Sequence, residues 1–427
     1  SFLYIAVLIL LACWIPSIRE LLKFIRASPP LTILILFWFF TLLSVFWSEN
    51  QFRGLAISGF LLLALGLATI VAINYRPLIK HSRKLQKLGF GLFIFLGIMA
   101  LFQIFGDAFG VSPAYTLLPT SYGGDVFGFA RATGFALEPQ FFASILLIPF
   151  IWGSHRVISQ NTNFVPIFVT AASSALLAVT LSRGALIGAF IAVLLLVFTV
   201  RSPIQRKLTL LALGLVGVAC AGALIFTSAS IRDDGISGTS ALSRSVSHVS
   251  LGLIDFSNNS RSNIQNEKLV AQLHDSQILS DENKPNTKIN DGYVPSSTTS
   301  RLEASSEAIE LWKQTPLTII GGVGSGGFGV NSQQDNPGHI VNNYYLELLV
   351  ETGLIGLLLF ISAVLLLLRS LYLAKNMLGF SLLAGLLIQM SFFSGNANIL
   401  HIWVVLGICV GSLYFTKHRR ADSDTIS

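Results

Sequence analysis

The sequence predicts an all-α, polytopic membrane protein with about eleven transmembrane helices and one large extracytoplasmic loop. The first reason is composition: of 427 residues, 53% are hydrophobic and only 11% are charged, and the mean hydropathy is +0.70. The second is that apolar runs recur at the length of a membrane span, and the third is that basic residues gather in alternate connections between them. The net charge of +7 forms no stripe of the kind that binds nucleic acid.

The predicted spans are apolar runs long enough to cross about 30 Å of hydrocarbon. They lie at about residues 1–18, 31–47, 55–73, 88–106, 135–152, 164–180, 184–200, 208–226, 353–368, 377–393 and 400–416. The first run has no basic segment before it and no small-residue cleavage site, so we interpret it as a trimmed terminus and not as a signal peptide. The three cysteines fall inside predicted spans, which indicates buried hydrophobes instead of disulfides or metal ligands.

The basic residues predict which side of the membrane each connection occupies, because Lys and Arg in short connections stay in the cytoplasm. Most of them lie in one set of connections and in the C-terminal tail: Arg19, Lys23, Arg26, Arg76, Lys80, Arg83, Lys84, Lys87, Arg156, Arg201, Arg206, Lys207, Arg369, Lys375, Lys417, Arg419 and Arg420. The short connections of the opposite side hold only Arg53, Arg131 and Arg183. We therefore expect the C-terminus in the cytoplasm.

This alternation divides the chain into an N-terminal transmembrane bundle (1–226), a large extracytoplasmic loop (227–340), C-terminal transmembrane helices (341–416) and a cytoplasmic tail (417–427). Within the loop, residues 227–299 are rich in Ser, Asn, Asp, Gly and Thr, a composition that predicts disorder. Residues 300–340 should hold a helix and a glycine-rich turn. Ser300 and Glu303 have the spacing of a capping box, and Pro316 marks the end of that helix.

Three arginines on the extracytoplasmic side are candidates for binding an anion. Arg131, Arg183 and Arg301 each lie at or just before a predicted helix start, where the helix dipole disfavours a cation. A guanidinium beside a helix N-terminus is an anion site, and a phosphate or diphosphate is the natural anion at this depth. The alternative for each arginine alone is contact with lipid headgroups or with a carboxylate such as Glu138.

Further polar residues stand close to the membrane on the same side. Glu138 either pairs with Arg131 or positions an acceptor hydroxyl. His339 stands just before an apolar helix, where it is either solvated or acts as a base. Asn343 lies four residues after His339. Glu347 and Glu351 are one turn apart and so share a face of the predicted helix.

The stretch GGVGSGGFG contains the pattern GxGxxG, at Gly322, Gly324 and Gly327. We exclude a dinucleotide-binding fold, because no βαβ unit can be built from an outer loop between spans. Two interpretations stay open: the turn packs closely against other backbone, or its amides face a phosphate.

Three stretches resemble the O-antigen ligase and O-antigen polymerase superfamily, which includes lipopolysaccharide ligases and Wzy-type polysaccharide polymerases. They are TLSRGALIGAF from Thr180, RLEASSEAIELWKQTPLTIIGGVGSGGF from Arg301 and HIVNNYYLELLVETGLIGLLLF from His339. The resemblance implies a GT-C-like membrane fold and an inverting, metal-independent glycosyltransferase that needs no cofactor. It also implies that Arg183, Arg301 and His339 are catalytic, and we expect Arg131, Glu138, Asn343 and Glu351 to bind substrate.

One departure from the family pattern bears on the reaction. Ligases have a histidine directly before an Asn-x-Tyr-Leu unit, whereas here Asn342 takes that place and His339 lies three residues earlier. We therefore favour a polymerase that joins oligosaccharide repeat units over a ligase that transfers glycan to lipid A core or protein. A transporter or flippase is the alternative of another class, but its path should carry polar residues near the midplane. A structural scaffold would leave the arginines unexplained.

The expected partners follow from the same resemblance. They are a polyprenyl-diphosphate-linked glycan donor (undecaprenyl diphosphate in bacteria), a glycan or lipid acceptor, membrane lipids and other membrane proteins of polysaccharide assembly, without nucleic acid. The expected location is the bacterial inner (plasma) membrane, with the active site outside.

Overall fold

The structure is a computed structural model that describes residues 18–125, 127–159, 163–232, 236–250, 293–331, 340–393 and 399–424. Every regular element in these ranges is a helix. The apolar helices at predicted spans are α3 (Pro29–Ser44), α4 (Gln51–Ile73), α6 (Ser82–Ala108), α8 (Pro139–Ser159), α9 (Phe164–Val179), α10 (Arg183–Thr199), α11 (Ile204–Ile231), α17 (Tyr344–Leu373), α18 (Met377–Gln389) and α19 (Leu400–Asp424).

The prediction of about eleven spans is supported in part. Among the described residues, six helices are long and apolar enough to cross a membrane: α3 with its extension, α4, α6, α8, α11 and α17. Shorter apolar helices occupy the predicted spans at α9, α10, α18 and α19. The remaining predicted span, residues 1–18, lies almost wholly outside the described residues.

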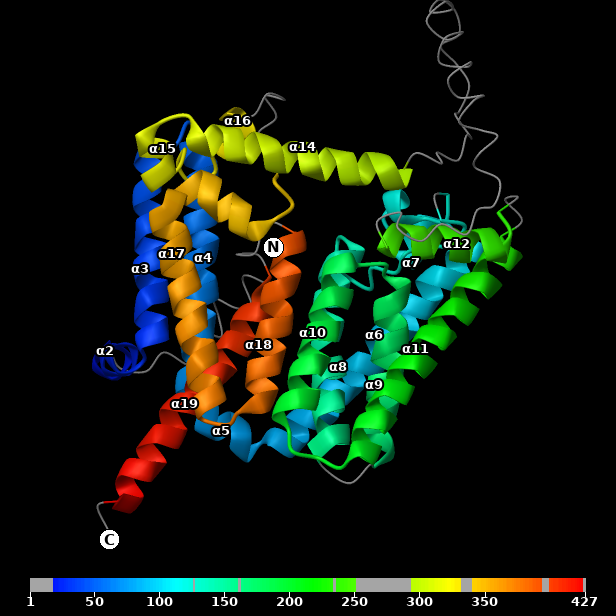
Figure 1. Cartoon of the computed structure of the whole chain (residues 1–427), viewed down its shortest axis with the longest axis horizontal. Coiled ribbons are helices and arrows are strands. Elements are labelled where there is room, and N and C mark those ends of the chain that lie inside the picture. The colour runs from blue at the N-terminus through cyan, green and yellow to red at the C-terminus, as the bar shows by residue number, and fades with distance from the viewer. Residues whose placement is uncertain are drawn as a thin grey trace, which may run out of the picture.

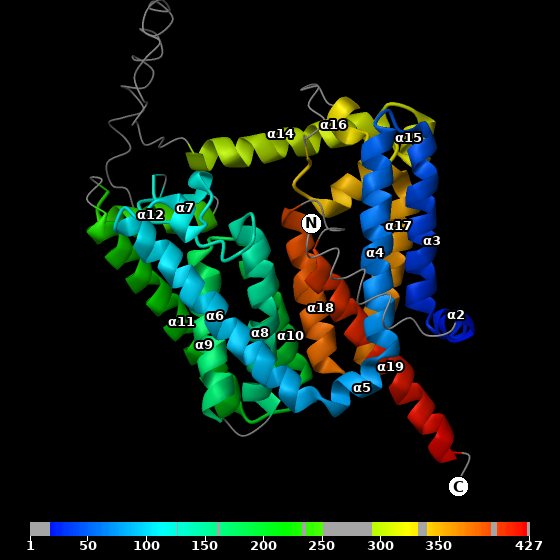
Figure 2. The same ribbon diagram turned by 180° about the vertical axis from the view of Figure 1, so that it is seen from behind.

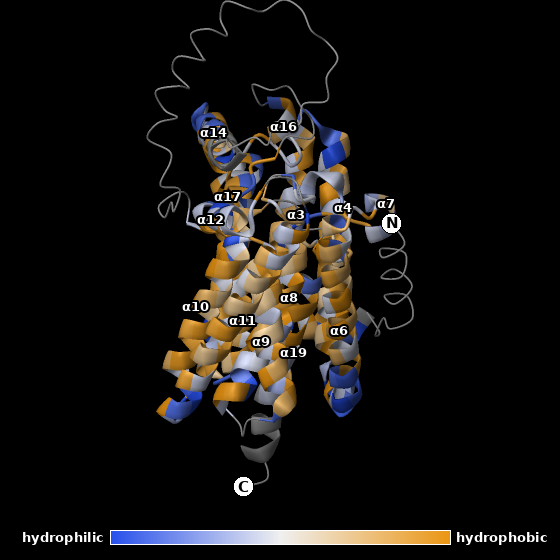
Figure 3. Cartoon of the chain, turned by 90° about the vertical axis from the view of Figure 1, so that its right-hand side faces the viewer, coloured by the Kyte–Doolittle hydropathy of each residue, from blue (hydrophilic) through white to orange (hydrophobic). Residues whose placement is uncertain are grey.

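The apolar helices run between two polar ends of the molecule (Figure 1). One end, here called the loop face, carries η1 (Val45–Trp47), α7 (Pro113–Thr116), η2 (Thr120–Tyr122), α12 (Gly238–Val249), α14 (Tyr293–Lys313), α15 (Pro316–Gly321), α16 (Phe328–Asn331) and η3 (Met390–Phe392). The opposite end, here called the tail face, carries α2 (Ile18–Ala27), α5 (Tyr75–Lys80) and the end of α19. Hydrophobic residues dominate the band between the two faces (Figure 3), as a bilayer requires.

The apolar helices pack as two groups joined by α18 (Figure 2). In one group α17 packs on α3 and α19 on α4; in the other α9 packs on both α8 and α11, and α10 on α8. Helix α18 contacts α10 and α8 as well as α17 and α19. At its contact with α10, a Cβ on Gly188 would lie 2.4 Å from the Gly385 carbonyl oxygen. Such close backbone approach through glycine is typical of helix pairs in membranes.

Helix α14 lies across the loop face, from the side of α12 to the side of α15 (Figures 1 and 2). It begins at Tyr293, before the predicted start at Ser300. The side chain of Thr315 and its partner Thr318 form the capping box of the next helix, α15. The chain therefore turns sharply after α14, because Pro316 fits the first turn of the new helix but not the interior of the old one.

Three parts of residues 227–299, whose composition predicts disorder, are helical: the end of α11, α12 and the start of α14. Residues 233–235 and 251–292 lie outside the described residues. Helix α11 continues to Ile231, and residues 238–249 form α12, which packs on α11. The buried side chains of α12 include Ala241, Ser245 and His248, spaced as one helix face. The serine-rich composition conceals this face, because serine and alanine bury well in a close helix contact.

Candidate functional site

The site is built around Arg183, the first residue of α10, which is buried although it carries a charge. Its Nε donates to the backbone oxygen of His248 at 2.7 Å, and its Nη2 lies 3.1 Å from Nδ1 of the same residue. A buried cation costs several kcal/mol unless its N–H groups are bonded. Helix α12 supplies both contacts, so the helix missed in the sequence holds the arginine that the sequence singled out.

Arg131 lies in the segment that leads into α8. Its Nε and Nη2 both donate to the Thr180 carbonyl oxygen, each at 3.0 Å. Thr180 is the C-cap of α9, so the guanidinium sits at the negative end of that helix dipole. The guanidinium also lies over the rings of Tyr122 and Phe127, at 5.8 and 5.7 Å from their centroids.

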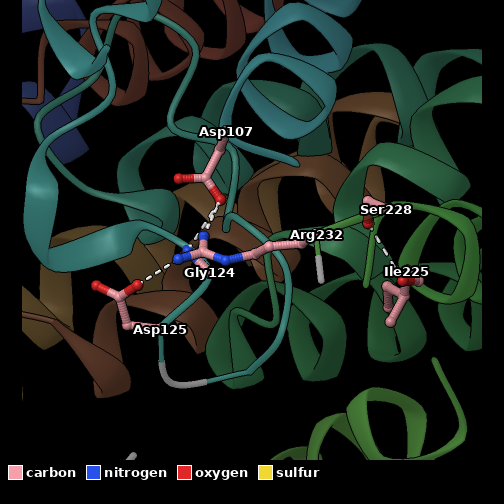
Figure 4. Close-up of polar contacts among 6 residues, drawn as sticks. All are labelled: Asp107, Gly124, Asp125, Ile225, Ser228 and Arg232. Atoms are coloured by element: carbon pink, nitrogen blue, oxygen red, sulfur yellow. Dashed lines mark hydrogen bonds and ion pairs between the residues drawn. The ribbon is translucent and has the colours of Figure 1, made fainter. Parts of the chain in front are cut away.

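A clamp of three charged residues holds the segment that carries Arg131 (Figure 4). Arg232, just after α11, pairs with Asp107 at the end of α6 and with Asp125. The Asp107 carboxylate also accepts from the Gly124 amide at 3.0 Å. We call Arg232, Asp107 and Asp125 the Arg232 clamp. It fixes the loop in which Arg131 donates its backbone N–H to the Tyr122 carbonyl at 2.9 Å.

His248 is the point where the three predicted arginines act together. Its ring packs edge-on against Phe127, with 5.1 Å between centroids. Burial is the main reason why the pKa of His248 falls from 6.5 to about 3, and the charges of Arg183, Arg131 and Arg301 lower it further. All the charged groups that shift this pKa are arginines, so the site is strongly positive. The sequence signal for His248 is its spacing, three residues after Ser245 and seven after Ala241, which places the three residues on one face of a helix.

Arg301, on α14, differs from the other two arginines. It is partly buried, and its backbone oxygen accepts from the Ser305 hydroxyl at 2.7 Å. Within the part of the chain that the structure describes, its guanidinium makes no hydrogen bond or ion pair. Arg301 therefore differs from Arg131 and Arg183, because its substitution would break no side-chain hydrogen bond or ion pair among the described residues.

Two of the predicted substrate-binding residues have local roles. Asn343 is the N-cap of α17, and its Oδ1 accepts from the amides of Tyr345 and Leu346 at 3.1 and 3.3 Å. Glu138 lies just before α8, where the Gln140 side chain donates to its carboxylate. His339 falls among residues 332–339 and so lies outside the described residues.

The glycine-rich turn packs against the kink in α17, which confirms the first of its two interpretations. Gly353 breaks the helix with φ 64° and ψ −166°. The amides of Val323 and Gly324 donate to the carbonyls of Val350 and Glu351 at 2.8 and 3.0 Å. A Cβ on Gly322 would lie 2.3 Å from the Glu351 backbone, so only glycine fits.

The remaining amides of the turn also have protein acceptors, so the phosphate-binding interpretation is wrong. The Ser325 amide donates to the Ser44 hydroxyl at 3.1 Å, and the amides of Gly326 and Phe328 donate to the Glu351 carboxylate. Glu351 is buried, with 5% of its surface exposed. It therefore holds the turn against α17.

Comparison with known proteins gives a family match. Residues 168–361 match the family model described as O-antigen ligase. The match covers 194 of the 427 residues and supports the resemblance to the O-antigen ligase and polymerase superfamily. The matched region includes Arg183, His248 and Arg301, whereas Arg131 precedes it. Members of this family are glycosyltransferase-like enzymes of polysaccharide assembly. No curated protein matches the chain.

Proposed function

We propose that this protein is a polymerase that joins polyprenyl-diphosphate-linked oligosaccharide repeat units during surface polysaccharide synthesis. The observation that carries the proposal is the convergence of Arg131, Arg183 and Arg301 on His248 at the loop face. The donor's diphosphate carries the charge and the oxygen acceptors that such a cluster binds.

Electrostatics supports an anionic ligand at this position. Like charges repel more strongly in a partly buried site than in water, because the effective dielectric constant there is about 20 instead of about 80. Three gathered arginines therefore destabilise the empty site, and an anion that binds all of them recovers this free energy. A diphosphate also becomes more strongly charged at its bridging oxygen as it leaves, so the arginines stabilise the transition state more than the bound donor.

The proposed reaction is a single displacement. A hydroxyl of the acceptor glycan attacks the anomeric carbon of the donor and forms the new glycosidic bond, with inversion. The bond between that carbon and the diphosphate oxygen breaks, and polyprenyl diphosphate leaves with both bonding electrons. The hydroxyl proton passes to a base, for which the family resemblance suggests His339, and Glu138 is a candidate for orienting the hydroxyl. No metal or cofactor takes part in this proposal.

The proposed orientation places the loop face outside the bacterial inner membrane and the C-terminus in the cytoplasm. The support is the exposed cations of the tail face, including Arg19, Lys23, Arg83 and Lys84. The same orientation brings the arginine cluster to the side where surface polysaccharides are assembled.

A genetic experiment tests the proposal. The gene is deleted and restored as wild type, Arg301→Ala or Lys313→Ala, and surface polysaccharides are separated by chain length. Lys313 is an exposed cation at the C-terminal end of the same helix, α14, which makes it a matched control. We expect deletion and Arg301→Ala to leave single repeat units on the acceptor, whereas Lys313→Ala gives full-length chains. Full-length chains from Arg301→Ala would contradict the proposal.

The family description favours a second candidate, a ligase that transfers finished glycan to lipid A core or protein. The same experiment separates the two. Bare acceptor with polymer accumulating on the lipid carrier would identify a ligase.

A further inference from the structure

The imidazole of His248 is a buried titratable group that the proposed displacement does not use. It belongs to α12, outside the apolar helices, and contacts Arg183 through two of its own atoms. The backbone oxygen accepts from Nε, and Nδ1 lies opposite Nη2 on the same edge of the guanidinium. One residue therefore fixes both the position and the plane of the Arg183 side chain.

Hydrogen-bond chemistry determines the form of the ring. A guanidinium nitrogen can only donate, so Nδ1, 3.1 Å from Nη2, must accept. An imidazole that accepts at Nδ1 is neutral and carries its proton on Nε2. Protonation of Nδ1 would remove the acceptor of Nη2 of Arg183. It would also add a fourth positive charge beside the three arginines.

The charged groups around the ring all favour this neutral form. Arg183 approaches from α10, Arg131 from the segment before α8, and Arg301 from α14. Arg244 lies one turn earlier on α12 itself. Just after α11, which packs against α12, Arg232 is paired with Asp107 and Asp125. Burial and the three arginines together keep the pKa of His248 near 3.

We propose that His248 is a positioning residue that, as the neutral Nε2–H tautomer, orients the Arg183 guanidinium toward the diphosphate. This inference rests on the proposed function, because it assigns Arg183 to the leaving group. His248 does not take the acceptor proton, and it acts only through Arg183. The Phe127 ring, edge-on to the imidazole, keeps the ring plane in place.

Two isosteric substitutions separate this role from a general packing role. In His248→Asn the side-chain oxygen falls near the position of Nδ1 and can accept from Arg183. In His248→Gln the amide falls near the position of Nε2, so the acceptor opposite Arg183 is lost. The backbone oxygen that accepts from Nε is present in both variants and in His248→Ala.

The binding test uses inorganic diphosphate as the probe and the full chain in lipid nanodiscs. We expect His248→Asn to bind within about 3-fold of wild type, and His248→Gln and His248→Ala to bind about 10-fold or more weakly, the scale of a lost hydrogen bond to a charged group. In an Arg183→Ala background, His248→Gln should cause no further loss. Equal affinities for His248→Asn and His248→Gln, or additive losses with Arg183→Ala, would overturn the proposal.

A second measurement does not depend on the substrate. Nitrogen NMR of histidine-labelled protein should show the His248 ring neutral at pH 5 with the proton on Nε2, and Arg183→Ala should disturb this signal. A charged ring at pH 5 would overturn the inference whatever the protein binds. If the NMR result holds but wild type and Arg301→Ala bind diphosphate equally, then the proposed function fails and with it the assignment of Arg183 to a diphosphate.

Discussion

The cations of the two membrane faces are similar in kind and differ in surroundings. On the tail face, Arg19, Lys23 and Arg26 project from α2 and are exposed, while Phe24 on the other side of the helix packs against Tyr414. On the loop face, Arg183 is buried and Arg131 is bonded to a helix C-terminus. An exposed cation needs no protein acceptor, whereas a buried one is stable only with acceptors or with an anion. Burial and bonding therefore separate the arginines of the proposed site from those that orient the chain.

Replacing Arg183 is expected to have the largest effect of any change that tests this contrast. Arg183→Ala removes the cation and leaves the His248 carbonyl without its donor, so polymer synthesis should fall by about 100-fold or more. Arg183→Lys should restore little, because an ammonium cannot reproduce the two contacts of the guanidinium edge. Incorporation of labelled repeat units by membranes with equal amounts of each variant measures this. Activity above half of wild type in Arg183→Lys would show that charge alone is sufficient.

Loosening the Arg232 clamp should have an intermediate effect. Arg232→Ala leaves a partly buried Asp107 without its cation, which should lower the free energy of unfolding by about 1–3 kcal/mol. Polymer synthesis should fall by about 10-fold, because the segment that positions Arg131 is displaced while Arg183 stays bonded. Thermal unfolding in detergent and the incorporation assay report the two effects. The double variant Asp107→Ala/Arg232→Ala should be more stable than Arg232→Ala, and a less stable double variant would contradict the role of the clamp.

The low pKa of His248 predicts a pH-dependent contribution to stability. In the unfolded chain a histidine binds a proton near pH 6.5, whereas in the folded protein His248 does so only near pH 3. Between these values the unfolded state binds more protons, so this contribution to the unfolding free energy decreases as the pH falls, by at most about 1.4 kcal/mol per pH unit.

His248→Asn cannot titrate and isolates this contribution. Its melting temperature should decrease less than that of wild type between pH 7 and pH 5. Parallel decreases for the two proteins would contradict a strongly lowered pKa at His248.

Removing a cation from the tail face should have the smallest effect. Lys23→Ala removes an exposed side chain, so stability should change by about 0.5 kcal/mol or less and polymer synthesis by about 2-fold or less. The same incorporation assay applies, and cysteine labelling of the C-terminal tail checks the orientation in the membrane. A loss as large as that of Arg183→Ala would remove the distinction between the two faces.

The predictions from the sequence succeeded where one strong physical signal is local. Hydropathy located the apolar helices. The conflict with the usual placement of arginine singled out Arg131, Arg183 and Arg301 as anion-binding residues, and that role stays a prediction. The structure brings these three together around one residue.

The sequence alone does not show the contacts of a residue where tertiary packing decides them. The sequence of α12 is polar and rich in serine. Its packing on α11 shows that it is a helix with His248 on the buried face. Asn343 and Glu351 are polar residues near the membrane surface, a pattern that fits a substrate contact equally well. Their actual acceptors and donors, the first turn of α17 and the amides of the glycine-rich turn, are set by the fold.

Diphosphate binding by the Arg301→Ala variant tests the central claim most directly. Arg301 adds charge to the cluster but makes no side-chain bond within the described residues, so its loss should not disturb the fold. In nanodiscs, wild type and Lys313→Ala should bind inorganic diphosphate alike, and Arg301→Ala should bind it at least about 10-fold more weakly, the scale of a lost charged contact. Equal binding by all three proteins would contradict the assignment of this cluster to the diphosphate of a lipid-linked glycan.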